Sequence, residues 1–202
     1  MLWNYEIANE TYQLHHDIEP LPNGNILVLA WERKTANEAF GIGRQTIDNP
    51  LNEMWSEAIL ELEVVGSNDA NIVWEWHLWD HLIQDIDPEL PNYGVVTDHP
   101  ELQDINYGNV GSNSDPLGPN GDWKHLNSID YNEDLDQIII SSRHHDEIYI
   151  IDHSTTTEEA ASSSGGNSGK GGNYLYRWGN PQTYGRGDES NHLLSVQHGV
   201  NW

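Results

Sequence analysis

The chain has 202 residues, which is enough for one domain with a sizeable hydrophobic core. Its 33 acidic and 8 basic residues give a formal net charge of −25, which argues against nucleic acid or an anionic membrane as a partner because both would repel it. The sequence contains no cysteine, so disulfide bonds and thiolate chemistry are excluded. No apolar run reaches membrane length, and residues 1–6 have neither the basic start nor the apolar centre of a signal peptide.

Short runs of alternating or β-branched residues, separated by turn residues, predict an all-β chain. In chain order, the predicted strands are residues 2–7, 14–18, 25–32, 58–65, 72–78, 124–131, 137–142, 147–152, 174–178 and 193–200. The pair Asn23-Gly24 predicts a hairpin between the second and third runs, because Asn and Gly suit the positive φ of a tight turn. A second meander is expected from the runs 58–65 and 72–78.

The connections between these strands differ in character. We expect a polar loop at 34–52, a helical turn at 79–86 and a long Asn/Pro/Gly/Asp-rich connection at 87–121. Residues 155–173 are rich in Ser and Gly, and we interpret them as a solvated loop insertion that joins two strands, because this composition buries little apolar surface.

Opening strands that carry a histidine and closing strands rich in aromatic residues recur along the chain. The opening segments contain HHDI, KHLNSID and VQHGV, and the closing segments are NYEI, IVWEWHL and YLYRW. A degenerate repeat of four short strands favours a β-propeller, whereas a β-sandwich would contain similar strands without the recurring histidine. We therefore predict that residues 1–202 form an arc of a larger propeller, with roughly two complete four-stranded antiparallel blades and parts of two more. Both ends of the chain suggest a fragment of a longer protein.

If the innermost strands converge, His16, His125, His198 and Arg143 share one space. Imidazoles can act as nucleophile, general acid or general base, and an arginine fork binds a tetrahedral oxyanion, so the set suits sulfuryl or phosphoryl transfer. Three imidazoles also suit a metal ion. However, the histidines lie 109 and 73 residues apart, which is no local metal signature, and an adjacent arginine disfavours a divalent cation.

Several motifs in this chain also form the pattern of a known family. They are WKHLNS at 123–128, SSRH at 141–144 and QH at 197–198, preceded by HHDI at 15–18 and LPNGN at 21–25. The chain resembles the bacterial arylsulfate sulfotransferases, whose pattern W-x-H-x-N-S followed by SSRH is matched at every position. The resemblance implies a six-bladed propeller that transfers a sulfuryl group from an aryl sulfate to a phenol, without a nucleotide donor or cofactor. It also implies a periplasmic or secreted parent protein, for which a homodimer is one option.

The resemblance further implies a role for each matched residue. His198 resembles the histidine that becomes sulfated, while His125 and Arg143 resemble the residues that hold the sulfate oxygens. Asn127 lies on the same face as His125 and is expected to bind substrate, and His16 resembles a further channel histidine that assists proton transfer or binding.

The choice of His16 over its neighbour His15 depends on register, since HDI at 16–18 superposes on HGV at 198–200, and His15 stays the alternative. The same comparison sets aside three further histidines, namely His144, His145 and His153.

The predicted activity is therefore a ping-pong sulfotransfer between a small aryl sulfate donor and a phenol acceptor. We expect the fragment alone to be inactive, because the remaining blades would supply further substrate contacts. A non-catalytic propeller that serves as a binding scaffold is the alternative, since a fold does not fix a function. A metal-dependent oxidoreductase is a third class.

Overall fold

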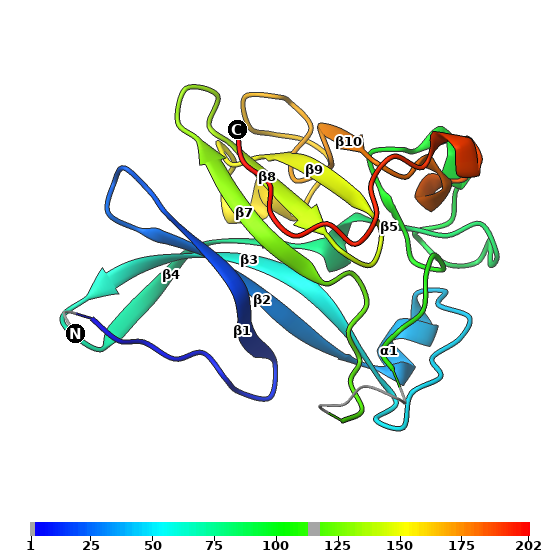
Figure 1. Ribbon diagram of the computed structural model, residues 1–202, viewed down its shortest axis with the longest axis horizontal. Helices are drawn as coiled ribbons and strands as arrows, with labels where there is room; N and C mark the ends of the chain where they lie inside the picture. Colours follow the sequence, from blue (N-terminus) through cyan, green and yellow to red (C-terminus); the bar gives the residue numbers. More distant parts are fainter. Residues whose placement is uncertain (1–2, 113–117) are drawn as a thin grey trace.

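The computed structural model describes residues 3–112 and 118–202, and it is built mainly from two four-stranded antiparallel sheets (Figure 1). The first sheet has the order β1-β2-β3-β4, with β1 at Tyr12–Pro20, β2 at Ile26–Thr35, β3 at Glu53–Val65 and β4 at Asp69–His77. The second has the order β10-β9-β8-β7, with β7 at Leu126–Asn132, β8 at Gln137–Ser142, β9 at Glu147–Asp152 and β10 at Tyr176–Trp178. The mostly β class and the four-stranded antiparallel sheets are thus confirmed. The propeller arc stays a prediction.

The hairpin between β1 and β2 is also confirmed, and Gly24 adopts the expected positive φ of 92°. This hairpin and the meander predicted from the runs 58–65 and 72–78 belong to one sheet, however. The reason is that β2 pairs with β3 along its whole length, from Ile26 opposite Leu62 to Thr35 opposite Glu53. The segment between β2 and β3 therefore connects two neighbouring strands of one sheet, because their backbone hydrogen bonds form a continuous antiparallel ladder.

The two sheets share a hydrophobic core. Leu29, Ile59 and Trp76 from the first sheet pack in the same cluster as Ile140 and Tyr149 from the second. Such a shared core fixes the position of one sheet against the other, because close-packed interiors leave few alternative arrangements.

The first strands of the two sheets, β1 and β7, lie side by side (Figure 1). Asp17 of β1 joins them: its Oδ2 accepts hydrogen bonds from the Ser128 hydroxyl at 3.1 Å and from the Ile129 backbone N–H at 3.1 Å. The strands that were predicted to carry the functional histidines are therefore held together by a charged side chain.

Two predicted strands are wrong. Residues 3–7 form no strand, apart from an isolated bridge between Ala8 and Gln13 beside them, and Leu2 lies outside the described residues. Residues 193–200 form no strand either, because Val196 (φ 46°) and Gly199 (φ 107°) interrupt the extended backbone. This C-terminal segment, red in Figure 1, runs past β7 and β8.

The connections contain short elements that were predicted only in part. The expected helical turn is the 3₁₀ helix η1 (Leu78–His81), and the polar loop 34–52 contains α1 (Ala36–Gly41), which begins at a capping box between Thr35 and Glu38. The long connection 87–121 includes residues 113–117, which lie outside the described residues. The remaining short elements are β5 (Leu82–Ile83), η2 (Val96–Asp98), β6 (Gln103–Asp104), η3 (Pro181–Tyr184) and η4 (Glu189–Asn191). In the described part of the chain, no helix has the length and apolar character needed to cross a membrane.

The Ser/Gly-rich segment 155–173 does join β9 to β10, but it is not simply a solvated loop. It contains α2 (Thr157–Ala160) and packs on the first sheet, where the Trp76 indole donates to Gly172 O at 2.8 Å and His81 Nε2 lies 2.8 Å from Ala160 O. A Cβ on Gly172 would lie 2.6 Å from His81 Nε2, so glycine permits this approach. The segment is ordered through hydrogen bonds and close backbone contact, which its composition did not reveal.

His153, which the sequence comparison set aside, connects the two sheets. Its Nε2 lies 2.9 Å from Glu61 Oε2 on β3, and its Nδ1 lies 2.8 Å from Asp136 Oδ1 in the β7–β8 turn. Burial opposes the imidazolium, but these two carboxylates outweigh it and raise the pKa of His153 above its usual 6.5. Burial likewise opposes the charge of Glu61, yet the hydrogen bonds from His153 and Asn25 lower the pKa of Glu61 to about 2.

We expect His153→Gln to remove a pH-dependent part of the free energy of unfolding. Because the folded-state pKa of His153 is raised, its contribution is complete below about pH 6.5 and is lost as the pH rises through the folded-state pKa. The wild type should exceed the variant by about 1.5–3 kcal/mol at pH 6, the usual range for hydrogen bonds to charged groups, and the gap should narrow by pH 9. Urea unfolding across that range measures it. A gap that stays constant with pH would contradict the ion-pair interpretation.

Candidate active site

His16 and His125 share an unusual backbone conformation. Both have a positive φ, 53° and 54°, in the left-handed region that few non-glycine residues adopt. The pairing register shifts between Leu14 and Ile18 on β1, which includes His16, and between Leu126 and Ser128 on β7, just after His125. A bulge turns a side chain out of the regular alternation, and such strain is common at functional sites. A positive-φ histidine next to or within a register shift therefore recurs in the two sheets.

The three histidines predicted from the repeat come together. The ring centroids of His16 and His125 lie 4.3 Å apart, and those of His125 and His198 lie 6.1 Å apart. His16, rather than His15, is the residue beside His125, because His15 stacks on Trp31 with ring centroids 4.3 Å apart.

His198 reaches this position without belonging to a strand. The Asn127 side chain donates to Gln197 O at 2.7 Å, and the Gln197 amide donates to Ser142 O at 2.9 Å and Glu147 O at 3.1 Å. These bonds fix the backbone just before His198 against β7, β8 and β9. Asn127 thus positions the segment that carries His198, and its role in substrate binding stays a prediction.

A polar cavity of about 510 Å³ opens beside His125. Arg143 and His144 line it together with His125, and the Arg143 backbone N–H donates to His125 O at 3.0 Å. The Arg143 guanidinium donates to His144 Nε2 at 3.1 Å. Arg143 therefore shares one cavity with His125, and its cationic fork suits an anionic ligand there.

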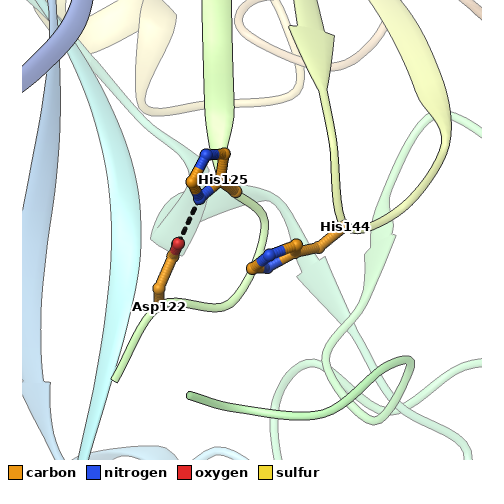
Figure 2. Close-up of side chains that lie close together, drawn as sticks. All are labelled: Asp122, His125 and His144. Carbon is orange, nitrogen blue, oxygen red and sulfur yellow. Dashed lines mark hydrogen bonds and ion pairs between the residues drawn. The ribbon is translucent and has the colours of Figure 1, made fainter. Parts of the chain in front are cut away.

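Sequence reasoning missed two residues of this site, Asp122 and His144 (Figure 2). The carboxylate of Asp122 accepts a short hydrogen bond from His125 Nδ1 and a second, of 3.2 Å, from the Trp31 indole. Burial opposes its charge, but the hydrogen bond from His125 outweighs burial and lowers the pKa of Asp122. The ring of His144, which the repeat comparison had set aside, lies 4.8 Å from that of His125. A carboxylate three residues before the histidine of WKHLNS was the available signal for Asp122.

Asp122, His125 and His144 each offer one potential metal-ligand atom, and these atoms lie within 4.8 Å of one another. Other contacts already engage them, however. Both oxygens of Asp122 accept hydrogen bonds, and the positively charged guanidinium of Arg143 donates a hydrogen bond to His144. A metal ion would therefore have to compete with these contacts for the same ligand atoms.

The remaining histidine of the set-aside group, His145, lies in the core. Its side chain is fully buried, and neither ring nitrogen has a hydrogen-bond partner among the residues that the structure describes. Burial lowers the pKa of His145 well below its usual value, so the ring is neutral.

The fold and the site together define a mostly β protein with a cavity lined by histidine and arginine. A family model described as Arylsulfotransferase (ASST) matches residues 1–161, and the chain belongs to this arylsulfotransferase family. The match covers the segments that carry His16, His125 and Arg143 and ends before His198. No curated protein matches the chain.

Proposed function

We propose that this protein moves a sulfuryl group from a phenolic sulfate ester to a phenol acceptor through a sulfohistidine intermediate on His198, without a nucleotide donor. The observation that carries the proposal is the convergence of His16, His125 and His198 beside a cavity that Arg143 lines. Membership of the arylsulfotransferase family supports the class of enzyme.

The residue types suit the chemistry of sulfuryl transfer. The reaction requires an in-line nucleophile and cationic donors on the equatorial oxygens of the transferred group, by analogy with phosphoryl transfer. In our proposal the neutral ring of His198 attacks sulfur, the S–O bond to the phenolic oxygen breaks, and the phenolate leaves. Arg143 and His125 hold the sulfate oxygens, and Asn127 keeps the segment with His198 in place.

The architecture of the parent protein forms part of the proposal. We infer that the two sheets are neighbouring blades of a propeller, with β1 and β7 as their innermost strands, and that the parent has six blades. The support is the side-by-side position of β1 and β7 and the positive-φ histidine that lies beside or within a register shift of each opening strand. A periplasmic or secreted location accords with this family assignment.

A two-substrate assay tests the function. The full-length parent protein is incubated with a chromogenic aryl sulfate, with and without a phenol, and phenol release and acceptor sulfation are followed. We expect release that depends on the acceptor, and a sulfated peptide containing His198 when the acceptor is omitted and the protein is digested. Binding of the aryl sulfate without any release would instead support the scaffold alternative.

A further inference from the structure

A continuous row of hydrogen bonds leads from a buried carboxylate to the active site. Glu57 Oε2 on β3 lies 3.0 Å from His15 Nε2, and His15 Nδ1 lies 2.8 Å from His16 Nδ1. The side chain of Glu57 is 0% exposed and that of His15 is 3% exposed. The row ends at His16, whose ring lies against His125.

Neighbouring groups fix the geometry of this row. The second oxygen of Glu57 accepts the backbone N–H of Leu126 at 2.9 Å, which anchors the carboxylate to β7. The His15 ring stacks on Trp31 at an interplanar angle of 12°. Neither group can rotate away without losing these contacts. Among the described residues, no hydrogen-bond partner is found for His16 Nε2, which leaves this atom for a substrate.

The protonation state of Glu57 decides which atom donates and which accepts in both hydrogen bonds of the row, because each bond contains one proton. If Glu57 is ionised, His15 donates Nε2–H to it and accepts Nδ1–H from His16, so that His16 Nε2 carries a lone pair. If Glu57 is protonated, it donates to His15 Nε2, His15 donates Nδ1–H to His16, and His16 carries its proton on Nε2. One proton on Glu57 therefore changes His16 Nε2 from an acceptor into a donor.

We propose that Glu57, His15 and His16 form a proton wire that stores, between the two half-reactions, the proton exchanged with the phenolic oxygen. This inference rests on the sulfotransferase function proposed above and extends it. A ping-pong transfer needs a proton donor when the first phenolate leaves and a proton acceptor when the second phenol attacks.

The wire can act as the proton donor in the first half-reaction and as the proton acceptor in the second. When the donor's S–O bond breaks, His16 Nε2–H gives its proton to the departing phenolate, His15 Nδ1–H passes its proton to His16, and Glu57 passes its proton to His15. When the acceptor phenol attacks the sulfur of sulfohistidine, its O–H proton enters at His16 Nε2 and the same shifts run backwards. The sulfuryl group leaves the His198 nitrogen, and the starting state is restored.

The electrostatics of the row support this direction of transfer. Burial raises the pKa of Glu57, and the nearby Asp122 adds to this effect against the opposing charge of His15. Partial burial, followed by repulsion from His125 and His15, lowers the pKa of His16 to about 4. A proton received by His16 is therefore less stable there than on Glu57. The other titratable groups that face the row are Lys124 and Tyr174 around Glu57 and His198 beside His16.

A titration of the unmodified protein tests the wire without any mutation. With ¹⁵N-labelled histidine, the ring nitrogens of His15 and His16 report which nitrogen carries the proton. We expect His15 to move its proton from Nδ1 to Nε2, and His16 from Nε2 to Nδ1, in a single step as Glu57 ionises. Tautomers that stay unchanged across the pH range would overturn the proposal, whether or not transfer is observed.

Kinetics with a series of aryl sulfates provide the second test. Glu57→Gln keeps the size of the side chain and an acceptor for the Leu126 N–H, but it cannot release a proton. We expect it to lower the transfer rate by about 10²–10⁴-fold for donors whose phenol has a pKa of about 10, and far less for nitrophenyl donors, which leave without a proton.

Glu61→Gln is the matched control, because Glu61 lies on the same strand and also pairs with a histidine, His153, at 2.9 Å. Its effect should not depend on the leaving group. These kinetics use the full-length parent protein. An equal loss across the donor series in Glu57→Gln would overturn the wire. Absence of transfer in the full-length wild type would overturn the proposed function, and the tautomer titration would then decide the wire.

Discussion

His198→Ala should abolish sulfuryl transfer while the fold stays intact. In the proposed mechanism the covalent intermediate forms on this ring, so its removal leaves no nucleophile for either half-reaction. The His198 side chain is exposed, and among residues 3–112 and 118–202 its one hydrogen bond joins Nδ1 to Val196 O at 3.2 Å. The free energy of unfolding should therefore change by no more than about 0.5 kcal/mol.

The measurement combines acceptor-dependent phenol release with a search for the sulfated peptide. His99→Ala serves as the control, because His99 is a similarly exposed histidine that pairs with Glu101 and does not line the cavity. Full turnover by His198→Ala, with the control unchanged, would contradict the assignment of the nucleophile and direct attention to His125 or His16.

Asp122→Asn should lower the transfer rate by about 10²–10⁴-fold, the usual contribution of a positioned acid or base. The asparagine oxygen can keep the hydrogen bond from the Trp31 indole, so the fold should tolerate the change. Its amide group, however, presents a donor to His125 Nδ1, which favours the opposite tautomer of that ring. In that tautomer Nδ1 carries the lone pair and Nε2 carries the proton, so Nε2 of His125 would donate to the substrate instead of accepting from it.

The effect should appear mainly in kcat and in the shape of the pH–rate profile, since the cavity and the fork of Arg143 are unchanged. Asp136→Asn is the matched control, because Asp136 also pairs with a histidine, His153, at 2.8 Å in the same sheet. It should lower stability without altering the profile. If both variants gave the same kinetic loss, the effect would be one of folding rather than of the orientation of His125.

The strands of the second sheet were the most predictable part of the fold. The strands at 137–142 and 147–152 match the prediction residue for residue, because β-branched runs between polar turns identify a buried strand locally. The segment 193–200 shows the limit of that reasoning. It has a strand-like pattern, yet it bonds to side chains such as Asn127 and Ser128 rather than to a neighbouring strand.

The sequence predicted the histidines and the arginine of the candidate site, but not the residues that form hydrogen bonds with them. The recurring histidines and Arg143 followed from motifs that are contiguous in the sequence. Asp122, His144 and the pair Glu57–His15 did not. Glu57 lay one residue before the predicted strand 58–65, and in the structure it is on β3. His15 and Glu57 are 42 residues apart, and only the pairing of β1, β2 and β3 brings them together.

The sequence by itself determined the mostly β class, the strands at 137–142 and 147–152 and the set of residues that carries the arylsulfotransferase pattern, because each depends on neighbours along the chain. The tertiary structure alone decided which of His15 and His16 lies beside His125, since the bulge on β1 turns one ring toward β7 and the other toward Trp31. It also decided that Asp122 and Glu57 reach the histidines. Such contacts join segments far apart in sequence, and the packing of two sheets on one core is what places them.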